Sequence, residues 1–221
     1  MFEKQKNIDI NGENFFGFKI EGKSYKSLVF DDMLNTEDCA EQKGFELIGM
    51  SFDDENEEIK YTKIAYADFL EFPTDGFTNE YIEKYHPKYN RYDMMDAYSQ
   101  ETTDIADALK LDNYKKSKFS EEIYRCPVIC LEKFVVDKKY RGYGFGKEIM
   151  SNLPFILLHA CESAGIIAFT AFPFEDKGKS EEILKKNEQK LYKFYKDCGY
   201  TKCADYGVLG GRVFAKVPDF F

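Results

Sequence analysis

The chain contains little of what builds a metal centre. Tryptophan is absent, histidine occurs twice and proline six times in 221 residues. Six cysteines are present, but no two of them form a C-x-x-C pair. Zinc sites need clustered Cys and His ligands, so we expect no bound metal. Several of these cysteines fall in apolar segments, where Cys acts as a small hydrophobic residue, and we expect free thiols.

Long apolar runs are also missing. The N-terminus, MFEKQKNIDI, has no apolar core of the kind found in a secretion signal. No apolar segment approaches the roughly twenty residues that a membrane-spanning helix needs. We therefore expect a cytoplasmic protein that has no membrane partner.

Basic residues are outnumbered by acidic ones. The chain has 31 Lys and Arg and 40 Asp and Glu, which gives a net charge of −9. A phosphate backbone needs a basic surface, so we expect no nucleic-acid partner. The acidity is compatible with a cationic substrate, although solubility alone also explains it. The acidic run at 53–58 reads as a solvated loop, because a calcium loop needs Gly and spaced ligands.

Apolar and aromatic residues are abundant. Hydrophobic residues make up 43% of the chain, which includes 21 Phe and 16 Tyr. This content excludes a disordered chain and is enough for a globular core. The length allows one large domain or two small ones, and no low-complexity linker divides it. We predict a single domain over 1–221.

The apolar patterns predict alternating strands and helices. Glu21-Gly22-Lys23 reads as a turn between two short strands, Gly44 as a helix stop, and Pro127 as the site of a bulge. Pro154 falls inside a helical pattern, and Asn152 could begin a second helical segment there. We expect strands at 14–20, 25–30, 45–52, 59–72, 123–136, 166–172, 201–205 and 212–217. We expect helices at 31–43, 79–85, 99–111, 144–164 and 180–198.

A tyrosine-rich segment at about 78–117 has two interpretations. It carries six tyrosines together with Arg91, Asp93 and Asp96. In one interpretation it is a lid or wall whose acidic and tyrosyl groups meet a substrate. In the other, its aromatic residues pack a helical hairpin onto a sheet, which is the usual role of such stripes.

The stretch 131–150, LEKFVVDKKYRGYGFGKEIM, carries the strongest functional signal. An apolar run ends at Val136, and Arg141-x-x-Gly144-x-Gly146 then opens a helix. Glycines let the backbone approach an anion, and N–H groups at a helix start can bind it. The ten residues 138–147 hold four basic residues and no Asp or Glu. Glu148 after Gly146-Lys147 excludes the Walker pattern, and the Rossmann fingerprint also fails.

Two motifs in this part of the chain resemble those of the GNAT acetyltransferase superfamily. The segment 136–146 resembles motif A, with the signature Arg/Gln-x-x-Gly-x-Gly/Ala. The segment 187–200, NEQKLYKFYKDCGY, resembles motif B, a helix with an early Asn and a final Tyr-x-x-x-Gly-Phe/Tyr. The resemblance covers roughly 123–217, the cofactor-binding core, and leaves 1–122 as an N-terminal part. It implies a mixed α/β (α+β) fold: a mostly antiparallel sheet with a splayed parallel strand pair and flanking helices.

The resemblance implies acetyl-CoA as the acyl donor and a primary amine of a small molecule or peptide as the acceptor. Backbone groups at the end of the motif A strand would pair with the pantetheine amides, and the glycine turn would hold the pyrophosphate. Lys138 and Lys139 are candidates for the 3′-phosphate. The implied cofactor-binding residues are Phe134, Val135, Val136, Arg141, Gly142, Tyr143, Gly144, Phe145, Gly146, Lys147 and Asn187.

Two residues are candidates for catalysis. Glu132 is a charged residue in an apolar strand, where burial raises a carboxyl pKa, and it is our candidate base; Glu175 is the alternative. Pairing of Glu132 with a surface Lys or Arg is the competing interpretation. Tyr195 matches the general-acid tyrosine of the family, and Tyr192 is the reserve. The alternative function is a catalytically silent CoA-binding regulatory or interaction module, and a homodimer stays open.

Overall fold

The computed structural model is centred on one eight-stranded sheet, in the order β1-β2-β3-β4-β5-β6-β8-β7. It describes residues 8–28, 40–53, 56–72, 91–172, 178, 180–205 and 211–219. All neighbouring strands are antiparallel except β5 and β6, which are parallel. The prediction of a mixed, mostly antiparallel sheet with one parallel pair is therefore confirmed at this level.

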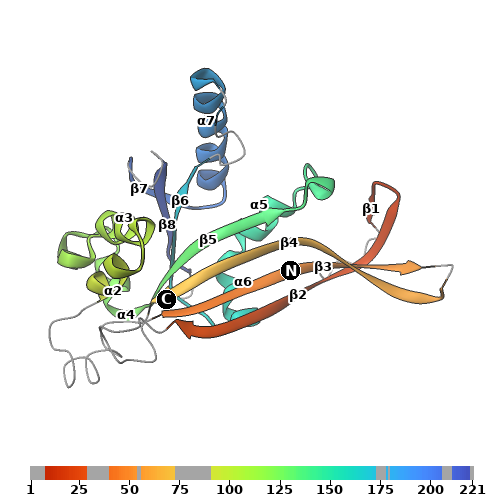
Figure 1. Ribbon diagram of the computed structural model, residues 1–221, viewed down its shortest axis with the longest axis horizontal. Helices are drawn as coiled ribbons and strands as arrows, with labels where there is room; N and C mark the ends of the chain where they lie inside the picture. Colours follow the sequence, from red (N-terminus) through yellow and green to blue (C-terminus); the bar gives the residue numbers. More distant parts are fainter. Residues whose placement is uncertain are drawn as a thin grey trace.

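The strands differ greatly in length between the two halves of the sheet. Three long strands of 16, 14 and 15 residues make up most of the N-terminal part and run past the helices as an extended arm (Figure 1). The strands are β1 (Ile8–Ile10), β2 (Glu13–Leu28), β3 (Ala40–Asp53), β4 (Glu58–Phe72), β5 (Val128–Val136), β6 (Ile166–Ala171), β7 (Thr201–Ala204) and β8 (Arg212–Lys216).

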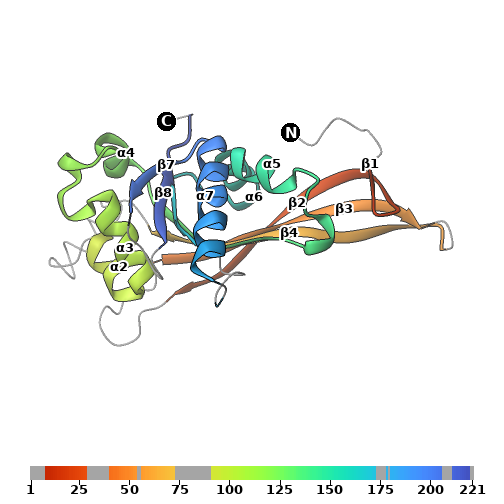
Figure 2. The same cartoon turned by 90° about the horizontal axis from the view of Figure 1, so that it is seen from above.

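Helices cover both faces of the sheet. Seen from above, α7 lies between the β7–β8 hairpin and α5, while α2, α3 and α4 gather beyond the opposite side of that hairpin (Figure 2). The helices are α2 (Arg91–Tyr98), α3 (Gln100–Leu109), α4 (Ser120–Arg125), α5 (Phe145–Ser151), α6 (Leu153–Cys161) and α7 (Glu181–Asp197). Two 3₁₀ turns, η1 (Leu111–Lys116) and η2 (Lys138–Tyr140), complete the described elements.

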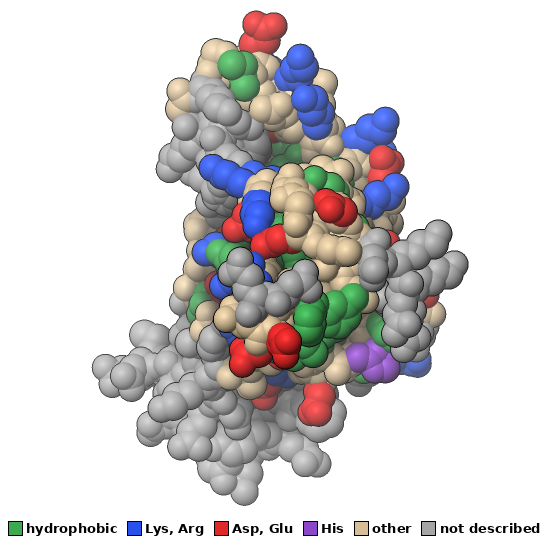
Figure 3. Space-filling view, turned by 90° about the vertical axis from the view of Figure 1, so that its right-hand side faces the viewer, with side chains coloured by type: hydrophobic (Ala, Val, Ile, Leu, Met, Phe, Trp, Pro, Cys, Tyr) green, Lys and Arg blue, Asp and Glu red, His purple; other side chains and the backbone are tan. Residues whose placement is uncertain are grey.

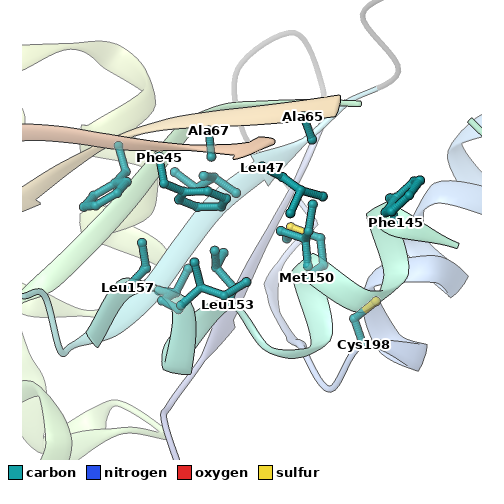
Figure 4. Packing of buried hydrophobic residues seen from close by; sticks show 14 of the residues in the cluster. Phe45, Leu47, Ala65, Ala67, Phe145, Met150, Leu153, Leu157 and Cys198 are labelled. Atoms are coloured by element: carbon teal, nitrogen blue, oxygen red, sulfur yellow. The ribbon is translucent and has the colours of Figure 1, made fainter. Parts of the chain in front are cut away.

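Each face of the sheet has its own core, because successive strand residues point to opposite sides. One core joins the sheet to α5, α6 and α7, and Figure 4 shows Phe45 and Leu47 facing Met150 and Leu153 within it. The other core joins the sheet to α2, α3 and α4. Strand β6 has no exposed residue and contributes to both, with Phe169 in the first core and Ala168 in the second.

The expected turn at Glu21-Gly22-Lys23 is wrong, because 13–28 form one continuous strand with a bulge between Ser24 and Ser27. Gly22 is needed for a different reason. A Cβ on this residue would lie 1.6 Å from the carbonyl oxygen of Ala160, so α6 could not approach the strand. The glycine marks a close approach between a helix and a strand rather than a turn.

The expected helix at 31–43 is wrong where it can be compared. Residues 40–43 are the beginning of β3, and Gly44 continues that strand opposite Lys23. Residues 31–39 lie outside the described ranges. The strand expected at 45–52 and its pairing with the strand expected at 59–72 are confirmed, with slightly wider bounds.

The expected strand at 123–136 begins too early. Residues 120–125 form α4, and the strand starts at Val128. Pro127 lies just before the strand, where its carbonyl accepts a hydrogen bond from Ile166 N–H at 2.9 Å, and it creates no bulge. The bulge is found at Glu132 instead, because Leu131 and Lys133 pair with the adjacent residues Phe69 and Asp68.

The helical pattern at 144–164 is divided at Asn152, as Pro154 predicted. The chain forms α5 and then α6, in which proline occupies the first turn and its missing N–H has no consequence. Asn152 does not cap α6 with its side chain. Its Nδ2 donates to Glu148 O at 2.9 Å, so it closes the preceding helix.

The tyrosine-rich segment contributes helices to the second core. Met94, Met95, Ile105 and Leu109 from α2 and α3 are buried against the sheet, which supports the packing interpretation for these two helices. Ser99 caps α3, close to the predicted helix start at 99. The helix expected at 79–85 lies outside the described ranges. None of the described helices combines the length and apolar character that crossing a membrane requires.

Candidate functional site

The parallel strands β5 and β6 pair over only three residues each, Val128–Cys130 and 166–168. Beyond this point β5 continues beside β4, and β6 continues beside β8. Figure 1 shows the two strands running apart, β5 toward α5 and β6 toward α7. We call this opening, between 131–136 and 169–171, the β5–β6 fork. Within it, the described residues form no ladder between the two facing edges. Apart from the Thr170 backbone, which is hydrogen-bonded to Glu101, backbone N–H and C=O groups on these edges are available to a ligand.

The turn after β5 has a backbone suited to an anion. Gly142 and Gly144 have φ angles of +88° and +87°, a region that disfavours side chains, and a Cβ on either would meet no atom within 4 Å. Gly144 is the residue before α5, and Glu148 N–H donates to its carbonyl at 3.0 Å. The N–H groups before Glu148 in the first helical turn have no acceptor within the helix. The predicted glycine turn therefore offers open space and available donors.

The N-terminal arm holds this turn in place. Asn11, between β1 and β2, donates from Nδ2 to Lys139 O at 2.7 Å and accepts from Tyr143 Oη at 3.2 Å. Glu13 accepts from Tyr140 Oη at 2.7 Å and forms an ion pair with Lys139 at 3.1 Å. Although burial alone would raise it, these hydrogen bonds and one from Lys60 lower the pKa of Glu13 to about 2. The arm therefore fixes the turn through side chains that are more than a hundred residues away in the sequence.

The charge around the turn is mixed rather than uniformly positive. In the space-filling view of this end of the molecule, Lys and Arg side chains are interspersed with Asp and Glu (Figure 3). Lys139 is occupied by Glu13, so one of the two lysines considered for a 3′-phosphate already has a partner. Arg141 folds back and donates from Nε to Val136 O at 2.9 Å, so its side chain braces the turn.

The predicted cofactor-binding residues of β5 and α5 divide into core and open positions. Phe134 and Val136 pack against the first core, while the half-buried Val135 points the opposite way along the strand. Phe145 is buried, with its ring 5.3 Å from Phe18, so only its backbone can reach a ligand. A Cβ on Gly146 would be in ordinary van der Waals contact with Val136 and Phe134, and Lys147 is exposed.

Helix α7 places Asn187 and Tyr195 on its half-buried, inward face. The Tyr195 ring lies 4.6 Å from that of Phe169, on the β6 side of the fork. Burial raises the pKa of Tyr195 to about 12, so its phenol stays protonated at neutral pH. Tyr192 is more deeply buried and lies under Arg212, whose guanidinium is 4.3 Å from its ring. Of the two tyrosines, Tyr195 is the one that contacts a fork residue.

Glu132 is the extra residue of the β5 bulge and has no partner in β4. Its side chain is exposed, and a long contact of 3.5 Å joins Oε1 to the hydroxyl of Tyr98 from α2. Desolvation by the surrounding protein raises the pKa of Glu132, and the charge of Asp68 adds to the rise, against the hydrogen bond from Tyr98. In the described part of the chain, no Lys or Arg forms an ion pair with Glu132, which argues against the competing surface-pair interpretation.

Sequence reasoning missed Glu101, which belongs to the first turn of α3. Helix α3 packs on β6, and the Thr170 backbone forms a hydrogen bond with the Glu101 carboxylate. This hydrogen bond lowers the pKa of Glu101. Desolvation and the charge of Glu132 have the larger effect and raise that pKa. Glu101 thus faces the fork from a helix that is distant in the sequence. Its only sequence signal is its position two residues after the capping Ser99.

Several residues of the tyrosine-rich segment have structural roles. Arg91 is buried and donates to the carbonyls of Cys126 and Ile123, where it closes the end of α4. Tyr92 donates to Asp107 at 2.7 Å, and this hydrogen bond raises the Tyr92 pKa to about 12. Among the described residues of this segment, Tyr98 contacts Glu132 at the fork. The alternative base Glu175 lies outside the described residues.

No protein-family model matches the chain, and neither a curated protein nor a solved structure matches it. Within the described ranges, no group of three or more His, Cys, Asp and Glu side chains could hold a metal ion. A function for the chain therefore has to come from its own residues and their arrangement.

Proposed function

We propose that the protein is a GNAT-type N-acyltransferase that moves an acetyl group from acetyl-CoA to a primary amine. The observation that carries this proposal is the β5–β6 fork together with the glycine turn that directly follows β5. A pantetheine chain carries amides that can pair with unpaired strand edges, and a pyrophosphate needs N–H donors in an open turn. This chain offers both features in sequence, from Leu131 to Gly146, as the motif A resemblance requires.

The residues around the fork suit each step of the transfer. The Glu132 carboxylate takes a proton from the acceptor ammonium, and the amine nitrogen then attacks the thioester carbonyl carbon. A strand N–H near Phe134 stabilises the oxyanion that develops. The C–S bond breaks as the carbonyl reforms, Tyr195 gives its proton to the leaving thiolate, and the nitrogen loses its second proton to the phenolate. The products are an amide, free CoA and one proton, held at Glu132 until it is released.

The raised pKa values fit these roles. A carboxyl group whose pKa lies above its usual range is a better base near neutral pH than an ordinary one. A buried phenol with a pKa of about 12 is protonated near neutral pH, so its proton is present when the C–S bond breaks. Glu132 lies beside α2, whereas the Tyr195 ring contacts Phe169 from α7, so the two groups come from different sides of the fork and the donor and the acceptor can approach separately.

The test is calorimetry with acetyl-CoA on the purified full-length chain, followed by CoA release in the presence of a panel of amines. We expect binding in the micromolar range and thiol release that depends on the amine. Binding without release for any amine would favour the silent CoA-binding module. If acetyl-CoA does not bind at all, the glycine turn is only a turn and the proposal is wrong.

A further inference from the structure

The α3 side of the fork carries several negative charges. Glu101 and Asp104 come from successive turns of α3, and Glu132 comes from the bulge of β5. Asp104 accepts a hydrogen bond from Gln100 Nε2 at 2.9 Å, which leaves its charge in place. Among the described residues, no Lys or Arg forms an ion pair with any of these three carboxylates. In the described structure, these three carboxylates therefore lack a basic side chain that would neutralise them.

A second observation points to a ligand at the same place. Thr170 of β6 is 8% exposed, and in the described structure its Oγ1 has no hydrogen-bond partner. Its neighbours Ile166 and Ala168 belong to the core beneath α3, so alternation puts the Thr170 side chain on the α3 side of the sheet. Leaving a buried hydroxyl unpaired is unfavourable. A ligand that donates hydrogen bonds would satisfy this oxygen.

An ammonium ion meets both requirements, because it carries positive charge and has only donors. Burial raises the pKa of Glu101 and repulsion by Glu132 raises it further, and a cation between the two carboxylates would relieve that repulsion. The charge of Asp104 also acts on Glu101, so a second cation one helical turn further along α3 would find a carboxylate as well.

We propose that the acceptor is an amine with at least two positive charges, whose reacting ammonium lies between Glu101 and Glu132 and whose second cation lies at Asp104. This inference rests on the acyltransferase function proposed above. Glu101 is a binding residue that recruits the ammonium, whereas Glu132 takes the proton. The acceptor enters from the α3 side, and the glycine turn serves the donor from the other end of β5.

The test compares n-butylamine with 1,4-diaminobutane as acceptors for the full-length protein saturated with acetyl-CoA. The two molecules have the same carbon chain and differ by one cationic group. We expect kcat/KM for the diamine to be higher by about fivefold or more, because a partly buried ion pair is stronger than an exposed one. In Asp104→Asn this ratio should fall to nearly one. In Glu101→Gln the KM for both amines should rise more than kcat falls.

Asp107→Asn is the matched control on the same helix. It removes the same charge, but the Asp107 carboxylate is hydrogen-bonded to Tyr92 and is not among the charges that shift the pKa of Glu101. We expect the diamine preference to persist in this variant. If Asp107→Asn and Asp104→Asn reduce the preference equally, the effect is one of overall charge and the assignment of Asp104 is wrong.

Direct calorimetry of 1,4-diaminobutane on the CoA-bound protein separates this inference from the proposed function. Acyl transfer to both amines with equal kcat/KM would keep the acyltransferase and overturn the dication site. Diamine binding that is weakened by Glu101→Gln and Asp104→Asn, in a protein that transfers no acyl group, would support the site and overturn the function. Diamine binding that neither variant weakens would overturn the site in either case.

Discussion

The two sides of the β5–β6 fork are built in different ways. At the outer end of β5, the proposed anion-binding surface is made of backbone: a glycine turn and the start of α5, all within 136–147. On the α3 side, the surface is made of side chains: Glu132 from β5, Glu101 and Asp104 from α3, and Thr170 from β6. A backbone site is formed by one short stretch of chain, whereas a side-chain site needs several elements to meet. The difference explains why the sequence revealed the first and concealed most of the second.

Gly144→Glu should have the largest effect on binding at the backbone side of the fork. It puts a side chain and a negative charge into the space above the turn, so we expect acetyl-CoA binding to weaken by about 100-fold or more, or roughly 2.7 kcal/mol, in calorimetry. Gly178→Glu is the matched control, because Gly178 also has a positive φ, of +90°, and open space at its Cβ position. A Gly144→Glu protein that binds normally would remove the turn from the site.

Tyr195→Phe separates binding from chemistry on the α7 side of the fork. Loss of a general acid should lower kcat by about 100-fold while acetyl-CoA affinity stays nearly constant, as measured by steady-state kinetics and calorimetry. Tyr192→Phe makes the same atomic change three residues earlier on the helix and should leave kcat unchanged. If Tyr192→Phe is the slower variant, the reserve tyrosine has the role instead.

Glu13→Gln tests how far the N-terminal arm supports the backbone side. The variant weakens the tie to Tyr140 and loses the ion pair with Lys139, so we expect the free energy of unfolding to fall by about 1 kcal/mol. We also expect acetyl-CoA affinity to drop by about threefold, because the turn is held less firmly. Denaturant unfolding and calorimetry measure the two effects. Glu181→Gln, which breaks an exposed helical ion pair with Lys185, should change neither quantity.

The stabilisation that Glu13 provides should depend on pH. Its pKa is lowered from 4.5 to about 2 on folding, so the stabilisation is fully present above pH 4.5. It should be lost as the pH falls from about 4.5 to 2. Wild type and Glu13→Gln should therefore differ in unfolding free energy at pH 7 and converge near pH 2. A difference that stays constant over this range would show that the carboxylate charge is not responsible.

Much of the fold could be read from local patterns. The long strand pair β3–β4, the parallel strands β5 and β6, the break near Pro154 and helix α7 all follow from periodicity and from helix-breaking residues within a few positions. The errors came from glycines and prolines whose roles depend on contacts with residues far away in the sequence. Gly22 was predicted to lie in a turn because its sequence neighbours are polar. Its role is instead explained by the close approach of Ala160. Pro127 looked like a bulge, but the bulge is at Glu132.

The sequence by itself determined the glycine turn, the strand that leads to it and helix α7, because each depends on residues that are adjacent or a few positions apart. It also indicated Glu132, since a charge in an apolar strand stands out. Only the tertiary structure brought Glu101 to the fork, placed Tyr98 beside Glu132 and tied Glu13 to the turn. These contacts join elements tens to more than a hundred residues apart, and they depend on how α3 and the N-terminal arm pack on the sheet. No local pattern encodes that packing, because it results from burying many apolar side chains at once.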